Sequence, residues 1–187
     1  VTDRRGTNTP FDYGNQQGAN ATAGFTKTLM NGVDLIVDGG VRDKKQQAGF
    51  FGTLPTIPFN YVDSHLQTWS ITPRLSIKNV IFGMPSAILT GVDYYDATYH
   101  SDRPESKGAA PIHVYDIQQR TIAGYWQQTL GLLPTTDFSY GGRIQHTSLS
   151  ARDRYDPLAP GAFSAEATPL NTDEGQYALH IGLEHRF

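Results

Sequence analysis

The sequence predicts an all-β fold, an antiparallel up-and-down sheet of about seven strands that forms a segment of a transmembrane β-barrel. Three observations support this prediction. Apolar and polar residues alternate with a period of two along several runs, as on strands with one apolar and one polar face. Several runs exceed the ~5 to 6 residues of a typical soluble strand. Short turns and long polar stretches alternate between the runs, an asymmetry typical of outer-membrane barrels.

The alternation is clearest in three runs. Residues 33–42 have apolar residues or Gly at odd positions and mostly charged residues at even positions, and residues 68–78 and 177–183 repeat the pattern. Each run therefore predicts a strand with two unlike faces. Pro73 lies on the apolar phase and cannot donate to a ladder, so it predicts a bulge, a strand end or locally irregular pairing.

The remaining strands have a weaker signal, and they are expected at residues 21–30, 87–99, 114–130 and 137–148. In residues 114–130, Ile122, Tyr125 and Trp126 do not occupy alternate positions, so the sequence does not show which residues share a face of the strand. A bulge is one explanation.

The connections predict the orientation of the sheet. Asn31–Gly32 is expected to form a two-residue hairpin turn of the favoured type, and residues 83–86 and 133–136 two further tight turns. Long loops are expected at residues 43–65, 100–113 and 149–176. Outer-membrane barrels have short periplasmic turns and long extracellular loops. The pattern therefore predicts the three turns on the periplasmic side.

Composition excludes several classes of protein. The chain has 187 residues, no cysteine and a formal charge of -3. The absence of cysteine excludes thiol chemistry, and the negative charge gives no broad electrostatic attraction for nucleic acid, so no nucleic-acid partner is expected. The mean hydropathy is -0.42, and no window approaches the ~20 apolar residues of a membrane-spanning helix. Residues 1–187 are expected to form one structural unit, and the start at Val1 suggests a fragment or a processed chain.

Several stretches resemble the barrel of TonB-dependent outer-membrane receptors of the cobalamin and iron-chelate type. They are DLIVDGGV (34–41), TWSITPRL (68–75), GVDYY (91–95), YDIQQR (115–120), AGYWQQ (123–128) and GLEHRF (182–187). The resemblance implies part of a barrel of about 22 strands whose lumen is closed by an N-terminal plug. This chain contains no counterpart of the plug, so the resemblance predicts a partial barrel in a longer receptor.

The resemblance also implies a function. The parent protein is expected to lie in the bacterial outer membrane, in contact with its lipid, and to import a bulky, scarce nutrient such as an iron-siderophore, haem or cobalamin. Transport would be powered by the TonB complex through the plug, after capture of the ligand by the loops. Asp34, Asp38, Arg42, Arg74 and Lys78 are expected to face the lumen or the plug.

Ligand capture is expected to use the long loops. These place aromatic side chains beside two cations, a combination that suits binding of an organic chelate. The candidate residues are Phe50, Phe51, Phe59, Tyr61, Arg152, Arg154 and Tyr155.

No catalytic, cofactor or metal site is predicted, and the chain is not expected to be an enzyme. Asp93, Asp96, His100 and Asp102 are close enough in sequence to suggest a hard cation, but solvated positions are the preferred interpretation, with Asp93 facing the lumen. The Gly-Gly pairs at 39–40 and 141–142 lack a following helix, so they predict close packing or a bulge instead of a phosphate loop.

Aromatic residues are expected near strand ends, where interfacial girdles would lie; they are Trp69, Tyr94, Tyr95, Tyr99, Tyr125, Trp126, Tyr140, Tyr177 and Phe187. Two alternatives remain open at this point. One is a soluble all-β binding module whose apolar residues fill a core. The other is a small self-contained outer-membrane barrel that acts as a passive pore or an adhesin.

Overall fold

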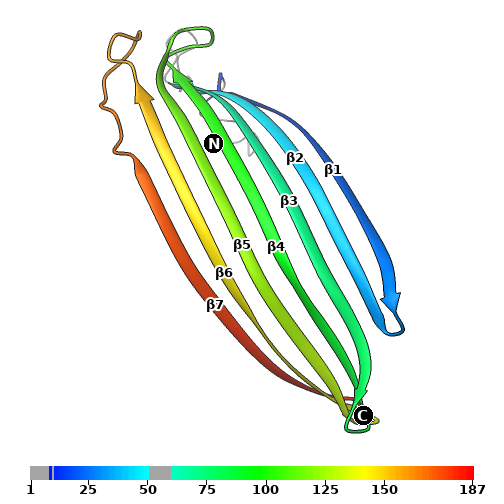
Figure 1. Cartoon of the computed structure of the whole chain (residues 1–187). Coiled ribbons are helices and arrows are strands. Elements are labelled where there is room, and N and C mark those ends of the chain that lie inside the picture. Colours follow the sequence, from blue (N-terminus) through cyan, green and yellow to red (C-terminus); the bar gives the residue numbers. More distant parts are fainter. Residues whose placement is uncertain (1–8, 10, 51–59) are drawn as a thin grey trace, which may run out of the picture.

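A computed structural model describes residues 9, 11–50 and 60–187 of the chain, and the strands among them form one antiparallel sheet (Figure 1). The strands follow one another in sequence order, and each pairs with its predecessor and its successor. The seven strands are β1 (Tyr13–Met30), β2 (Val33–Phe50), β3 (Asn60–Ile81), β4 (Met84–Pro104), β5 (Pro111–Leu133), β6 (Thr136–Tyr155) and β7 (Leu170–His185). The predicted fold class and strand number are confirmed.

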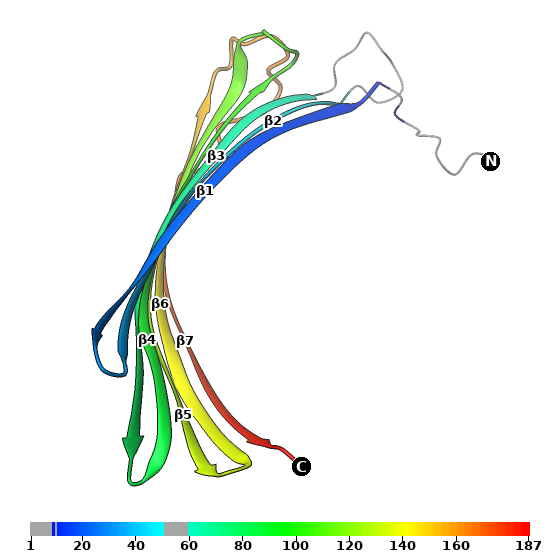
Figure 2. The same cartoon turned by 90° about the vertical axis from the view of Figure 1, so that its right-hand side faces the viewer.

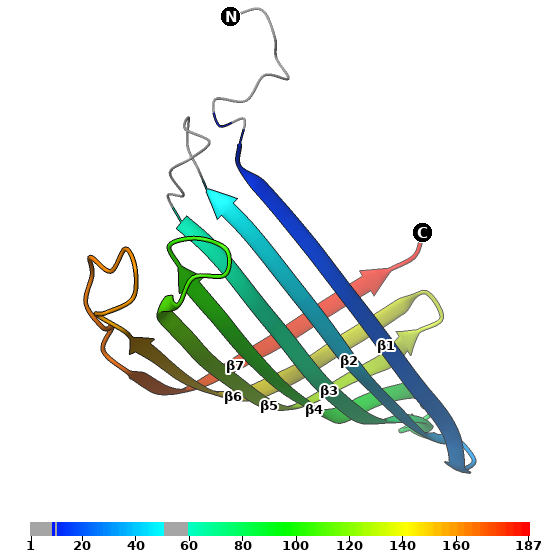
Figure 3. The same cartoon turned by 90° about the horizontal axis from the view of Figure 1, so that it is seen from above.

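The sheet is a single, strongly bowed layer. Figure 2 shows the strands from the side, curving together away from a flat plane, and Figure 3 shows their order from β1 to β7 from above. The sheet is open, because β1 and β7 form its two edges and do not pair with each other. Among the described residues no helix is long and apolar enough to span a membrane.

Three tight turns lie at one end of the sheet, as the sequence predicts, but two differ in detail. The second consists of Phe82 and Gly83, whose φ angles of 52° and 80° are both positive, and Met84 already belongs to β4. In the first turn only Gly32 has a positive φ, of 76°, and the β1–β2 register shifts beside it. Both favoured two-residue geometries need a positive φ at the first central residue, so the prediction is wrong for Asn31–Gly32. The second turn, with positive φ at both residues, has such a geometry instead.

The connections at the opposite end are shorter than predicted. The strands continue through most of the residues expected to be loops, leaving 51–59, 105–110 and 156–169 as connections, of which 51–59 lies outside the described residues. Hydrophobic alternation could not reveal these strand extensions, because their few apolar residues, such as Tyr61 and Val62, do not alternate with polar ones. Backbone pairing alone, which does not depend on side-chain polarity, makes them strands.

Local pairing confirms one expected irregularity and corrects another. Around Pro73 the β3–β4 ladder omits two residues, 72 and 73, and then resumes in the same register, whereas Pro73 still lies opposite Val37 of β2. The bulge considered near Tyr125 is wrong, since β5 runs in unbroken register against β4 and β6 there. Its register shifts lie near its ends, next to Pro104 and Leu133.

The register places the apolar phase of every strand on one face of the sheet. One row of paired residues runs Leu35, Leu75, Thr90, Trp126, Gly142, Leu179. Because side chains alternate across a strand, all residues of the same parity as this row share its face. We call it the apolar face, and the opposite one, which carries Arg74, Tyr125 and Arg143, the polar face. The face of β5 that parity alone could not assign is thereby settled.

The apolar side chains of this face form an apolar band, which we define by Ala21, Ala23, Phe25, Val33, Leu35, Val37, Val41, Trp69, Ile71, Leu75, Ile77, Ile88, Val92, Tyr94, Ile122, Trp126, Tyr140, Ile144, Tyr177, Leu179, Ile181 and Leu183. Between the band and the loop end, the apolar face becomes polar, and we call that part the upper zone. In β5, for example, Ile122 is followed on this face by Arg120 and Asp116.

Burial is the reverse of that in a soluble protein. In β5, Ile122 and Trp126 of the apolar band are 52% and 46% exposed, whereas Ala123 and Thr121 of the polar face are 2% and 9% exposed. No second layer covers either face in the part of the chain that the structure describes. Small residues on the polar face are therefore covered by their own neighbours, as on the inside of a curve, and the apolar band lies on the outside.

Candidate functional site

The polar face is the first candidate site, since it would line the interior of a closed barrel. Two ion pairs cross it between strands. Arg74 Nη2 lies 2.7 Å from Asp38 Oδ2, and Arg143 Nη1 donates to Asp93 Oδ2 at 2.6 Å. Asp34, Asp38, Arg42, Arg74 and Lys78 all have polar-face parity, so they share the face that the sequence predicts for them.

The Asp93–Arg143 pair reaches across β5. Ala123, opposite Asp93, is small, and Tyr125 lies opposite Arg143, whose guanidinium carbon is 5.9 Å from the centroid of the tyrosine ring. Gly91, opposite Tyr125, leaves room for the phenol, because a Cβ there would lie 2.9 Å from Tyr125 Oη and 2.7 Å from the Pro73 carbonyl oxygen. The polar face thus holds a fixed arrangement of charges and a tyrosine.

The Gly-Gly pair at 141–142 is likewise explained by close packing. A Cβ on Gly141 would come within 2.4 Å of the Trp126 carbonyl oxygen and would overlap the His180 ring. Gly142 is less restricted, with Leu179 Cδ2 at 3.0 Å. These contacts agree with the interpretation from sequence that the glycines are structural.

His113 organises the loop end of the polar face. Its Nδ1 lies 2.8 Å from Asp153 Oδ2, and its Nε2 lies 2.7 Å from Ser164 Oγ in the β6–β7 loop. A carboxylate only accepts hydrogen bonds, so Nδ1 donates to Asp153. The Ala167 amide donates to the same Asp153 carboxylate at 2.9 Å. These contacts attach the loop to β5 and β6.

Two tyrosines enclose this histidine. Tyr115 stacks on the His113 ring with centroids 5.7 Å apart, and Tyr155 lies at 5.0 Å on a tilted plane. Burial raises the pKa of the Tyr115 phenol, and the nearby Asp153 carboxylate acts in the same direction. His113 and Asp153 were missed by sequence reasoning because they are 40 residues apart; their shared parity becomes visible only once the register is known.

The predicted aromatic candidates at the β2–β3 end are only partly described. Phe51 and Phe59 lie outside the described residues. Phe50 ends β2 and is 44% exposed, whereas Tyr61, near the start of β3, is only 4% exposed. Burial raises the pKa of Tyr61. Phe50 is therefore the accessible one of the two described residues.

The cationic candidates lie elsewhere than predicted. Arg152 and Arg154 were expected in a loop, but both belong to β6 and have apolar-face parity, so they lie in the upper zone, on the outside of the curve. Arg154 Nη2 donates to Asp116 Oδ2 at 2.8 Å. Tyr155 follows on the polar face, beside His113. The structure therefore separates the two arginines from Tyr155, and strands β4 and β5 separate all three from Phe50 and Tyr61.

Acidic residues that the sequence groups together are also separated by the strand. Asp93 has polar-face parity, while Asp96, His100 and Asp102 lie in the upper zone, within β4 instead of at the start of a loop as expected. Within the described ranges, no group of three or more His, Cys, Asp or Glu side chains could hold a metal ion.

The upper zone carries hydrogen-bonded charge pairs beyond the apolar band. Asp116 accepts hydrogen bonds from His100 Nδ1 at 2.7 Å and from Arg154. The bond from His100, followed by that from Arg154, holds the pKa of the Asp116 carboxyl below its ordinary value. Asp96 accepts in the same way from Arg120 Nε at 3.1 Å.

The expected aromatic girdles are found only in part. Trp69, Tyr94 and Tyr177 mark the loop-side edge of the apolar band. At the opposite edge Tyr140 Oη donates to Gln128 Oε1 at 2.6 Å, which gives its polar tip a partner. The girdle prediction is wrong for Tyr95, Tyr99 and Tyr125, which have polar-face parity.

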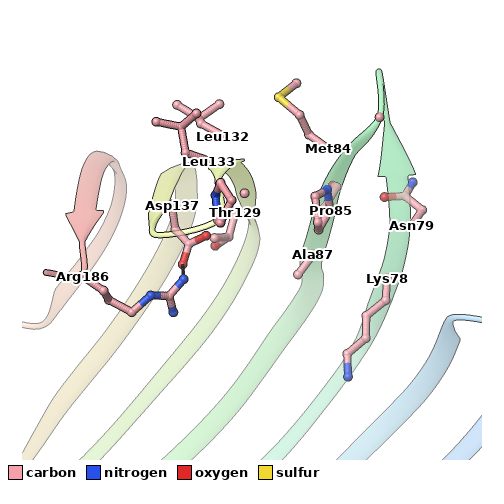
Figure 4. Close-up of a pocket in the computed structure, with 14 residues that line it drawn as sticks. Lys78, Asn79, Met84, Pro85, Ala87, Thr129, Leu132, Leu133, Asp137 and Arg186 are labelled. Carbon is pink, nitrogen blue, oxygen red and sulfur yellow. Dashed lines mark hydrogen bonds and ion pairs between the residues drawn. The ribbon is translucent and has the colours of Figure 1, made fainter.

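A second candidate site is a hollow at the turn end, with a volume of about 720 Å³ (Figure 4). Arg186 and Asp137 form an ion pair of 3.0 Å on one side of it, and Lys78 approaches from β3 on the other. Pro85 and Gly131 form part of its wall. The hollow opens between the turns and is shallow, and no other feature of it indicates a ligand.

Comparisons with solved structures identify the architecture. Over 93% of its length the chain superposes on 25% of the ferric citrate transporter FecA in its unliganded form, with a TM-score of 0.72 and 12% identity. The siderophore receptor PiuA from Acinetobacter baumannii gives a TM-score of 0.72 at 10% identity, over 94% of this chain and 31% of that one. The chain has the fold of part of a receptor barrel.

A third match extends this result. The ferric-catecholate import receptor Fiu from Escherichia coli K12 gives a TM-score of 0.62 at 16% identity and is covered to 31%. The chain thus spans about a quarter to a third of the receptors that it matches. No family model and no curated protein matches the sequence.

The nature of these neighbours bears on the histidine cluster. Hydrogen bonds in the order Ser, His, Asp also occur in serine hydrolases, but the matched structures are transporters and receptors, as expected for a chain that is not an enzyme. In this chain the contacts of His113 with Ser164 and Asp153 join the β6–β7 loop to β5 and β6.

The polar-face ion pairs predict a measurable contribution to stability. Replacing Arg143 with Met leaves the carboxylate of Asp93, whose side chain is 13% exposed, without its partner. The free energy of unfolding in detergent micelles, measured by urea titration, should fall by about 1–2 kcal/mol, less than for a fully buried pair because Arg143 is partly exposed. Arg186→Met, which breaks an exposed pair, is the control and should cost at most about 0.5 kcal/mol. Equal losses of unfolding free energy for the two variants would contradict the conclusion that the Asp93–Arg143 pair stabilises the sheet more than an exposed ion pair does.

Proposed function

We propose that the chain is a sector of the barrel wall of a TonB-dependent outer-membrane receptor. The observation that carries this proposal is the apolar band, which crosses all seven strands on the outside of the curve while hydrogen-bonded charges occupy the inside. Water penalises such an exposed apolar surface. A hydrocarbon environment favours it, and there each backbone group must find its partner within the protein, as the paired strands provide.

Strand length supports the membrane placement. The strands have 16 to 23 residues, about twice the ~9 to 11 that a tilted strand needs to cross the hydrocarbon core. On β3 the apolar positions run from Ile77 back to Trp69, and on the same face Gln67, His65 and Asp63 continue from there toward the loops. The upper zone is therefore the part that would project beyond the membrane, on the extracellular side if the short turns are periplasmic.

The open edges support a sector of a larger barrel. Since seven strands alternate in direction, β1 and β7 run the same way, and an antiparallel barrel cannot close by pairing them. Both edges are long, and unpaired edges of this kind are usually paired or covered in proteins. Further strands outside the described sheet would satisfy both edges.

In the parent receptor, the polar face would line the lumen and contact the plug, and the loops would capture the ligand. The substrate class that we propose is a bulky iron chelate, haem or a corrinoid, imported by TonB-coupled active transport. Two observations support it: the fold shared with a ferric citrate transporter, a siderophore receptor and a ferric-catecholate import receptor, and the resemblance of the barrel stretches to cobalamin-type receptors.

The membrane placement predicts opposite effects on the two faces of one strand. Ile71→Arg with Leu75→Arg puts two charges on the apolar band, each costing about 2–4 kcal/mol near the bilayer midplane. Ser70→Arg with Ser76→Arg puts the same charges on the polar face of β3 and is the matched control. The fraction of protein recovered in the outer membrane should collapse for the first variant and stay near the wild-type level for the second. Equal recovery of both would exclude lipid contact by this face.

The transport function predicts a loss of energy-dependent uptake when the gene is deleted. Cells with and without the protein are given radiolabelled ferric citrate, a ferric catecholate, haem or cobalamin at limiting concentration, each with and without a protonophore. Uptake of at least one of these ligands should require both the protein and the proton-motive force. Uptake that needs the protein but ignores the protonophore would instead indicate a passive pore, and no effect on any ligand would refute the substrate class.

A further inference from the structure

The turn between β1 and β2 consists of Asn31 and Gly32, the only Asn-Gly pair in the sequence. It lies beside β3, short of the turn that follows β3 (Figure 1). The Lys78 amide of β3 donates to the Gly32 carbonyl oxygen at 2.6 Å. This hydrogen bond continues the β2–β3 ladder one step beyond its last pair, Val33 with Ile77. The first turn is therefore attached to β3 through its backbone.

The geometry of this turn requires Gly32 but leaves Asn31 unrestrained. Gly32 has a positive φ, and a Cβ there would overlap the Lys78 carbonyl oxygen, so a residue with a side chain would be both strained and obstructed. Asn31 does not have a positive φ, and it is exposed. Its carboxamide makes no hydrogen bond within the part of the chain that the structure describes. The Asn31 side chain is therefore free to approach the backbone that follows it.

This arrangement allows a reaction between Asn31 and the Gly32 backbone nitrogen. Among the hydrogen bonds of the described turns and loops, none has the Gly32 amide as its donor, and glycine has no Cβ to shield that nitrogen. After loss of its proton to a base, the nitrogen can attack Asn31 Cγ. The N–Cγ bond forms, the Cγ–Nδ2 bond breaks, and the leaving group regains the proton and departs as ammonia. The product is a five-membered succinimide ring, and no oxidant or reductant is needed.

We propose that Asn31 is a site of spontaneous deamidation, and that its isoaspartate product detaches the first turn from β3. Water opens the succinimide at one of its two carbonyl carbons. Opening at Cγ leaves an aspartate, whereas opening at the α-carbonyl carbon leaves isoaspartate, whose backbone runs through Cβ and Cγ and is longer by one atom. Both products add a negative charge to the turn. Only the longer backbone displaces the Gly32 carbonyl from the Lys78 amide. The inference depends on the turn alone and is independent of the proposed function.

Asn79 is a control within the same molecule. It is exposed and lies at the same end of the sheet, but it pairs with Ser86 inside the β3–β4 ladder and is followed by Val80. A residue in a ladder must open locally before its backbone can close into a ring. The β-branched side chain of Val80 also crowds the nitrogen that would attack. Asn79 is therefore expected to react much more slowly than Asn31.

The test follows both asparagines by mass spectrometry. The full chain is incubated in a nonionic detergent at neutral and at mildly alkaline pH, and peptides that contain residue 31 or residue 79 are analysed over time. Asn31 should exchange its amide for a hydroxyl at least about tenfold faster than Asn79, and faster at the higher pH. The product should accept a methyl group from an isoaspartyl methyltransferase. Asn31→Gln, which would have to form a six-membered ring, should stay unmodified. Val80→Gly gives Asn79 a following glycine within the ladder and should leave Asn79 slow.

Detachment of the turn is measured by hydrogen exchange of the Lys78 amide. Exchange should be faster in the isoaspartate fraction than in fresh protein, and unchanged in Asn31→Asp, which adds the charge without lengthening the backbone. Three results would overturn the inference: an Asn31 that reacts no faster than Asn79, an Asn79 that reacts as fast as Asn31 once Val80 is replaced by Gly, or Lys78 exchange that is the same before and after modification. The second would mean that the following glycine, and not the turn, determines the rate.

Discussion

The backbone ladder between neighbouring strands is the constraint on which the rest of the structure depends. Six antiparallel pairings commit the central amides and carbonyls to partners within the sheet, with a gap only beside Pro73 and register shifts only near strand ends. In the hydrocarbon core of a membrane, an unpaired backbone group has no water with which to form a hydrogen bond. The same ladder fixes side-chain parity, so a slip of one residue would exchange the two faces of a strand. The apolar band and the polar face therefore follow from the register.

The curvature of the sheet accounts for the kinds of residue found on each of its faces. A curved sheet crowds side chains on the inside, and the residues found there are small or hydrogen-bonded, such as Ala123, Gly91 and the Asp93–Arg143 pair. The outside has room for Trp69 and Ile144, which are 55% and 72% exposed. Burial of charge inside an otherwise uncovered sheet is costly unless the charges are paired, and on the polar face two arginines have aspartate partners across strands. This distribution distinguishes the sheet from a soluble module, whose apolar face would be buried.

The sequence was sufficient to predict the strands in which alternating apolar and polar residues mark the two faces. The apolar runs around Ile71 and Leu179 gave the strands, their faces and their number. It failed where the apolar residues are few and do not alternate, because the part of β6 beyond Ser148 has no periodic signal and was taken for a loop. That error moved Arg152 and Arg154 into a predicted ligand-binding loop, whereas the register puts them on the outer wall. The His113–Asp153 contact was equally invisible, since it depends on which strands are neighbours and in which register they pair.

Lipid contact by the apolar band is tested most directly by spin labels on β3. Single cysteines are placed in turn at residues 69 to 77 of the receptor in lipid vesicles, labelled with a nitroxide, and their accessibility to oxygen and to a water-soluble nickel complex is measured. The proposed placement predicts a period of two, with the odd positions accessible to oxygen, which concentrates in lipid, and the even positions accessible to the nickel complex or shielded by the plug. Odd positions shielded from both reagents would mean that protein covers the apolar band, and would contradict the barrel-wall assignment.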